Sequence, residues 1–147
     1  MLLTELFDKV DASNWKWTYT AFNYAKASFI VGTVKYEFIA DGDTTEPGLW
    51  ELTFRAVTRN EDYGFGLTKT GNSQKVMSTV ISIINDFLNN RKYKVEVITF
   101  SAKEDSRKKL YAKMIHRLVP TWKMSFRPGN DYGSEEFVLV SPKKDTI

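Results

Sequence analysis

The first half of the chain alternates between hydrophobic and polar positions, which is the pattern of β-strands with one buried face. Between Trp15 and Ala21, for example, aromatic residues are separated by Lys and Thr. This alternation, together with β-branched and aromatic composition, predicts strands over residues 15–21, 28–40 and 49–58. Turn residues at 41–43 and 47–48 break the pattern, and such short loops favour an antiparallel meander.

After residue 70 the hydrophobic period changes to that of a helix. Hydrophobic residues from Val76 to Leu88 recur at helical spacing, and the sequence Gly-Asn-Ser at 71–73 supplies a cap before them. The expected elements that follow are a buried strand at 95–100, a helix opened by the Ser-x-x-Glu capping box at 101–104 and stopped by Pro120, and a hairpin of 121–126 with 135–140. Weaker patterns add a short helix over 2–10 and a short strand over 65–69.

This order predicts one α+β domain over residues 1–141, followed by a flexible tail at 142–147. Its sheet is mixed and mostly antiparallel, and two main helices flank it. The strand–helix–strand step over residues 65–100 is expected to join two parallel strands.

Composition excludes several classes of site. The chain of 147 residues is 42% hydrophobic and 14% aromatic, which suits a domain with a sizeable core. It has no Cys, so disulfides, thiolate zinc sites and Cys nucleophiles are excluded. The N-terminus has no basic cluster before an apolar run, and no apolar run is long enough to cross a membrane. We therefore expect a cytoplasmic protein.

Positive charge is concentrated in the second half of the chain. Residues 91–127 hold 11 Lys and Arg against 3 Asp and Glu, although the whole chain has a net charge of only +3. Such asymmetry can mark an anionic partner, but it can equally be the solvated side of a helix. The residues that would form this basic face are Arg107, Lys108, Lys113 and Arg117, together with Arg91 and Lys92. A nucleic acid and an acidic protein would both fit it.

The turn at residues 68–75 is the first candidate for chemistry. Free backbone N–H groups at a helix N-terminus suit a phosphate or carboxylate, and Lys69 and Lys75 would add positive charge. The alternative is that Gly71 only makes the turn, while Asn72 or Ser73 only caps the helix.

Tyr111 and His116 are the other candidates. Tyr111 lies near several basic residues and could donate a proton, or it could be a core tyrosine with one hydrogen bond. His116 is the only histidine, so it cannot form a multi-histidine metal site, and we read it as a surface or half-buried residue. Neither Glu104–Asp105 nor Glu135–Glu136 has the spacing of a catalytic carboxylate pair.

From about residue 15 the predicted order of elements resembles the later part of the acyl-CoA-dependent GNAT acetyltransferase fold. Residues 68–73, Thr-Lys-Thr-Gly-Asn-Ser, stand where that family has its Arg/Gln-x-x-Gly-x-Gly/Ala turn around the CoA pyrophosphate, and the first glycine is shared. Residues 110–113, Leu-Tyr-Ala-Lys, are similar to the Leu-Tyr-x-Lys end of the family's last helix, whereas Glu104 and Arg107 replace its Asn and Ala.

This resemblance implies a possible cofactor and site. Acetyl-CoA would be the cofactor, and Tyr111 would be the catalytic acid. The residues that would hold the cofactor are Gly71, Asn72, Ser73 and Lys75. The first strand and two helices that wall the family's acceptor site have no counterpart before Trp15. We therefore expect a binding protein without a cofactor, and keep a divergent N-acetyltransferase as the alternative.

A second resemblance is closer at the level of the amino-acid sequence. The segments 70–72, 76–81, 100–102 and 106–111 look like parts of small uncharacterised proteins encoded by tailed bacteriophages. It implies a viral accessory protein acting in the cytoplasm of an infected bacterium. Its partner would be a host or viral protein, or a nucleic acid bound through the basic face, and not a membrane.

Overall fold

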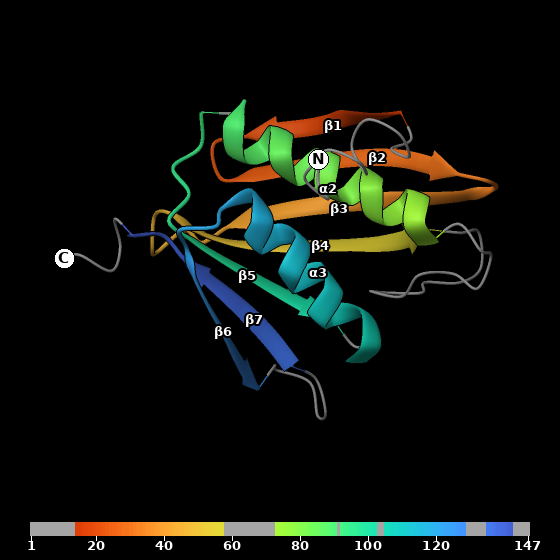
Figure 1. Cartoon of the computed structure of the whole chain (residues 1–147). Coiled ribbons are helices and arrows are strands. Elements are labelled where there is room, and N and C mark those ends of the chain that lie inside the picture. Colours follow the sequence, from red (N-terminus) through yellow and green to blue (C-terminus); the bar gives the residue numbers. More distant parts are fainter. Residues whose placement is uncertain (1–13, 58–72, 91, 103–104, 129–134, 143–147) are drawn as a thin grey trace.

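The computed structural model describes residues 14–57, 73–90, 92–102, 105–128 and 135–142. Two helices and seven strands lie in these segments (Figure 1). The strands are β1 (Trp15–Ala21), β2 (Tyr24–Val31), β3 (Val34–Gly42), β4 (Leu49–Val57), β5 (Val97–Ala102), β6 (Lys123–Pro128) and β7 (Glu135–Val140). The helices are α2 (Ser73–Asn89) and α3 (Asp105–Leu118).

All seven strands form one sheet, in the order β1-β2-β3-β4-β5-β7-β6. Strands β1 to β4 form the expected antiparallel meander. Strand β5 pairs parallel with β4, and β7 lies antiparallel between β5 and β6. The predicted α+β class is therefore confirmed: the sheet is mixed and mostly antiparallel, with two helices packed on it.

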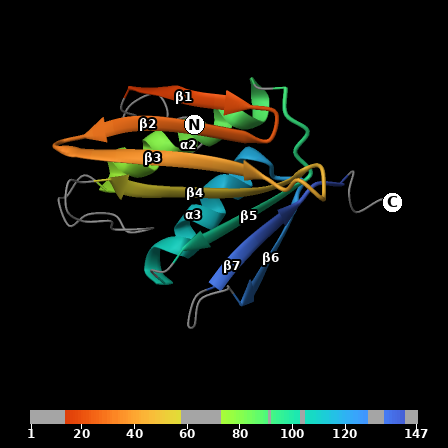
Figure 2. The ribbon, with the colours of Figure 1, turned by 180° about the vertical axis from the view of Figure 1, so that it is seen from behind.

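Both helices pack on the same face of the sheet. In Figure 1 they lie in front of the strands, and in Figure 2, seen from behind, the strands lie in front of them. The strand alternation explains this arrangement, because Tyr36, Phe38 and Phe54 point toward the helices and are buried. Helix α2 buries Phe87, whose ring packs against those of Trp17 and Trp50. The opposite face of the sheet, which we call the open face, carries the intervening side chains.

The region 28–40 was predicted as one strand, and this is wrong. The chain turns back at Gly32, so that β2 and β3 form a hairpin in which Val31 pairs with Val34. Gly32 has a φ of 63°, a conformation that costs glycine little and other residues more. Alternation continues on both sides of the turn, which is why the hydrophobic pattern did not show the break.

Several predicted boundaries also shift. Asp41 and Gly42 were read as a turn, but they belong to β3, and the loop starts at Asp43. Strand β5 continues to Ala102, into the segment expected to open the next helix. The expected pair of parallel strands joined through a helix is observed, and its first strand is β4. The helix predicted over 2–10 and the strand predicted over 65–69 lie outside the described residues. Within the described part of the chain, neither helix is long and apolar enough to span a membrane.

Candidate functional site

Two pairs of charged residues face each other across β3 and β4 on the open face. In the first pair Glu37 lies opposite Arg55. Glu37 also receives Lys26 from β2, with Nζ 2.7 Å from Oε2, and Arg55 Nη2 lies 3.5 Å from Oε1. Partial burial raises the pKa of Glu37, but Lys26 and then Arg55 outweigh it, so the pKa is lowered overall. The negative charge of Glu37 is therefore fully compensated by two cationic side chains.

In the second pair both side chains carry a negative charge. Asp41 lies directly opposite Glu51 on the same face of the same two strands. Like charges in this position repel each other. Partial desolvation, and then the charges of Glu136 and Asp41, raise the pKa of Glu51. Among the residues that the structure describes, neither Asp41 nor Glu51 has a salt bridge.

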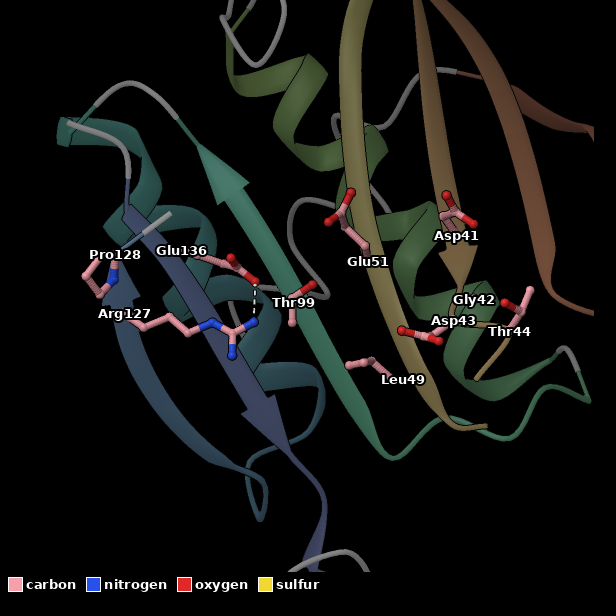
Figure 3. A pocket seen from close by; sticks show the side chains of 10 residues that line it. All are labelled: Asp41, Gly42, Asp43, Thr44, Leu49, Glu51, Thr99, Arg127, Pro128 and Glu136. Carbon is pink, nitrogen blue, oxygen red and sulfur yellow. Dashed lines mark hydrogen bonds and ion pairs between the residues drawn. The ribbon is translucent and has the colours of Figure 1, made fainter. Parts of the chain in front are cut away.

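These carboxylates line a pocket of about 520 Å³, which we call the acidic pocket (Figure 3). It spreads across the open face from β3 to β6. The lining residues are Asp41, Gly42, Asp43, Thr44, Leu49, Glu51, Thr99, Arg127, Pro128 and Glu136. Four of them carry a carboxylate and one carries a guanidinium, so the lining has a net charge of −3.

Thr99 lies in the middle of the acidic pocket. It pairs with Glu51 on one side and with Val138 on the other, and Figure 3 shows its side chain between Glu51 and Glu136. Thr99 is only 6% exposed. Among the described residues its hydroxyl has no hydrogen-bond partner. Burying a hydroxyl without a hydrogen-bond partner costs free energy, and a ligand in the pocket that hydrogen-bonds to Thr99 would remove this cost.

Glu136 and Arg127 form the far side of the pocket. Glu136 is 7% exposed, and its Oε1 accepts a hydrogen bond of 2.9 Å from Arg127 Nη2. Arg127 itself is on the outermost strand, and its side chain is 58% exposed. A buried carboxylate is therefore neutralised by a cation that water reaches freely.

Asp43, unlike the other carboxylates of the pocket, is hydrogen-bonded within its own loop. Its Oδ1 accepts hydrogen bonds from the Thr45 hydroxyl and amide, both at 2.7 Å, and from the Glu46 amide at 3.1 Å. These bonds lower the pKa of Asp43. Asp43 thus shapes the loop between β3 and β4. Within the described residues no group of acidic or histidine side chains is close enough together to hold a metal ion.

Comparison with known protein families matches residues 9–133 to DUF6934, a family of unknown function. The chain belongs to this family. The match includes Asp41, Glu51, Thr99 and Arg127, and it ends before Glu136. Neither the curated proteins nor the solved structures contain a match to this chain.

The cofactor-binding turn predicted for this DUF6934 member is placed only in part. Ser73 is the first residue of α2, and Lys75 is exposed in the first turn of that helix. Gly71 and Asn72 lie outside the described residues. The prediction that this turn holds a phosphate therefore stays a prediction.

Two residues of the predicted basic face, Lys113 and Arg117, are placed on the helix side of the sheet. Lys113 and Arg117 are exposed, one turn apart on α3. Lys92 is exposed as well, whereas the side chains of Arg107 and Lys108, and all of Arg91, lie outside the description. This DUF6934 chain thus carries exposed basic residues on one side of its sheet and the acidic pocket on the other.

The structure describes the side chain of only one of the two remaining candidates, Tyr111 and His116. The side chain of Tyr111 lies outside the description, so its role as an acid stays a prediction. His116 is half-buried, as expected, and its Nε2 lies 2.7 Å from the carbonyl oxygen of Trp122. Since a carbonyl can only accept, Nε2 carries the proton. His116 therefore fastens the end of α3 to the turn before β6.

Sequence reasoning missed the acidic pocket. Asp41 was read as a turn residue, and Glu51 as an ordinary outward-facing residue of a strand. Glu136 was correctly placed on a strand, but it was considered only as a pair with Glu135, and the two were set aside because adjacent strand residues point to opposite faces. Register could have revealed the pair Asp41–Glu51, since a hairpin loop of known ends fixes which residues lie opposite each other.

Proposed function

We propose that this chain is a binding protein whose acidic pocket receives a cationic side chain of another protein. The observation that carries this proposal is the unpaired position of Asp41 opposite Glu51. The same two strands place Glu37 opposite Arg55, so the fold accommodates a balanced pair. A positive group between Asp41 and Glu51 would turn the repulsion into two attractive contacts.

Thr99 and Glu136 support the same proposal independently. The Thr99 hydroxyl is buried and has an unused acceptor in the described structure, which an N–H group of a ligand can satisfy. Glu136 already binds one guanidinium, that of Arg127, so its surroundings accommodate this chemistry. An arginine or lysine side chain offers several N–H donors, enough for a carboxylate and a hydroxyl together.

The free energies of these interactions favour binding of a cationic side chain, but they limit its affinity. A hydrogen bond to a charged group contributes about 1.5–3 kcal/mol, while the repulsion that it relieves is worth up to about 1 kcal/mol. One side chain making two such bonds would reach about 4 kcal/mol, which corresponds to a dissociation constant of about 1 mM. A single arginine is therefore expected to bind weakly, and a longer segment more tightly.

The charge of the acidic pocket argues for a protein partner there rather than a nucleic acid. Phosphates would be repelled by its net charge of −3. The resemblance to bacteriophage proteins favours a host or viral protein as this partner. The exposed Lys113 and Arg117 lie on the helix side, so a nucleic acid bound there would not compete for the acidic pocket.

An NMR titration tests the proposal. Nα-acetyl-arginine amide should shift the amide signals of Glu51 and Thr99 at millimolar concentration. Nα-acetyl-citrulline amide, which has a similar shape and no charge, should shift them far less. Glu51→Gln should weaken binding several-fold, whereas Glu37→Gln, the same change outside the pocket, should not. Equal shifts with both ligands would refute the proposal.

A divergent acyl-CoA-dependent N-acetyltransferase is the second candidate. What supports it is the element order, strands, helix, strand, helix and two strands, which the GNAT resemblance implies. The parallel pairing of β4 with β5, on either side of α2 in the sequence, is a further support. Under this candidate Gly71, Asn72, Ser73 and Lys75 would hold the phosphates of acetyl-CoA. Tyr111 would be the acid.

Calorimetry with acetyl-CoA separates the two candidates. Micromolar binding that is lost in Gly71→Glu would establish the cofactor site, because a bulky negative side chain would fill the phosphate position. Lys113→Gln, which also lowers the net charge by one unit but lies on α3, should leave such binding intact. The absence of any binding heat would remove the acetyltransferase candidate.

A further inference from the structure

A second pocket adjoins the acidic pocket at the loop between β3 and β4. We call it the apolar pocket, and its volume is about 300 Å³. Its lining residues are Phe22, Asn23, Gly42, Asp43, Thr44, Pro47, Gly48, Leu49, Trp50 and Lys94. Gly42, Asp43, Thr44 and Leu49 line both pockets. A ligand can therefore reach from one to the other across this loop.

The apolar pocket has an unusually exposed aromatic wall. Phe22 lies in the turn between β1 and β2 and is 87% exposed. Single exposed hydrophobic residues are common on protein surfaces. Here, however, Phe22 borders a hollow together with Pro47, Leu49 and the edge of Trp50. Such a concave apolar surface is suited to a hydrophobic side chain.

Hydrogen bonds hold the walls of the apolar pocket in place. Trp50 Nε1 donates to the Lys94 carbonyl oxygen at 2.9 Å, and the Gly42 amide donates to the Asn23 carbonyl oxygen at 2.8 Å. The Gly48 carbonyl accepts from the amides of Glu96 and Val97. A pocket with fixed walls loses little entropy when a ligand enters.

We propose that the two pockets together recognise a two-part motif in an extended segment of a partner protein. An arginine or lysine enters the acidic pocket, and a large aliphatic side chain enters the apolar pocket beside Phe22. The motif has one residue between them, because side chains two positions apart point to the same side of an extended chain. This inference rests on the proposed function and adds the second recognition element.

Charge complementarity favours this occupant over other ligands. A nucleic acid lacks the cation that Asp41 and Glu51 require, and a polyamine lacks the apolar group that suits Phe22 and Pro47. An arginine next to an aliphatic residue supplies both. Its stem carbons can also lie along Leu49, which borders the two pockets.

Capped peptides measured by calorimetry and NMR test the inference. Acetyl-Gly-Arg-Gly-Leu-Gly-amide, or its reversed order, is expected to bind about tenfold more tightly than the same peptide with Gly in place of Leu. Phe22→Ala should remove most of this increment and leave the Gly peptide unchanged. Because Phe22 is exposed, this variant is expected to fold, and an unchanged melting temperature would establish that it does.

The outcomes separate this inference from the proposed function. If the Arg-Gly-Gly and Arg-Gly-Leu peptides bind equally, the second element is refuted while the cation site stands. If neither binds, the proposed function fails as well. Spermidine binding as tightly as the leucine peptide would also overturn the inference. Glu51→Gln should weaken both peptides by the same factor, since it changes only the acidic pocket.

Discussion

Asp41 on β3 lies directly opposite Glu51 on β4, although both side chains are negative and share the open face. The same strands place Glu37 opposite Arg55 four residues away. Glu37 and Glu51 can therefore be compared directly by mutation, because they lie on the same face of the sheet but have neighbours of opposite charge. Proteins often give up stability at binding sites, and under the proposed function this pair would be a measurable example.

Glu51→Gln is expected to stabilise the unbound protein by about 0.5 kcal/mol, because it removes the repulsion from Asp41 and Glu136. Glu37→Gln is expected to destabilise it by up to about 1 kcal/mol, because Lys26 and Arg55 lose their partner. Urea denaturation at neutral pH measures both free energies of unfolding. Destabilisation by Glu51→Gln would contradict the view that this residue is kept for binding.

The pH dependence of the free energy of unfolding should have opposite signs at these two glutamates. The pKa of Glu51 is raised from its ordinary value of 4.5, so the unfolded chain releases the proton first. Wild type should therefore lose stability relative to Glu51→Gln as pH rises through 4.5 toward the folded pKa, and the difference should then level off.

Glu37 has a lowered pKa, so its stabilising contribution should be present above 4.5 and be lost as pH falls through the folded pKa. Denaturation curves of wild type, Glu51→Gln and Glu37→Gln from about pH 3 to pH 7 test both signs. A difference between wild type and Glu51→Gln that shrinks as pH rises would show that the assigned direction is wrong.

Thr99→Val is expected to leave the unbound protein equally stable or to stabilise it by up to about 1 kcal/mol, because it removes a buried hydroxyl that has no partner among the described residues. Thr79→Val is the control, since Thr79 is also buried but its Oγ1 donates to the Lys75 carbonyl at 2.7 Å. That variant should lose about 1 kcal/mol. Similar losses in both variants would mean that Thr99 has a partner.

Arg127→Gln is expected to strengthen binding of Nα-acetyl-arginine amide by about fivefold, because Arg127 competes with the ligand for Glu136 and an ion pair of this kind is worth about 1 kcal/mol. Arg55→Gln removes another arginine from the open face, but one outside the pocket, and should leave affinity nearly unchanged. Weaker binding by Arg127→Gln would instead place Arg127 among the residues that hold the ligand.

Gly42→Ala is expected to destabilise the fold by about 1–3 kcal/mol. A Cβ at this position would lie 3.0 Å from the backbone oxygen of Asn23 and 3.2 Å from Cη2 of Trp50. The Asn23 oxygen also accepts the Gly42 amide, so it cannot move away without losing that bond. Thermal denaturation measures the loss. A melting temperature equal to that of wild type would show that the walls of the apolar pocket can yield.

The sequence by itself determined where most of the described strands and both helices lie and which side of them is buried. The alternation in β4 and the helical spacing in α2 predicted their buried residues, because a side chain's face depends on the local backbone repeat alone. His116 was likewise predicted to be a surface or half-buried residue, and it is half-buried. The predicted α+β class followed from the order of these elements.

Only the tertiary structure decided which residues lie opposite each other. The turn at Gly32 divides a continuous hydrophobic pattern into two strands, and the pairing of β3 with β4 brings Asp41 to Glu51. Thr99 and Glu136 join this pair because β5 and β7 lie side by side, although 36 residues lie between Thr99 and Glu136 in the chain. Strand order depends on contacts between distant segments, and register also depends on where each turn begins and ends, so a local hydrophobic period alone fixes neither of them.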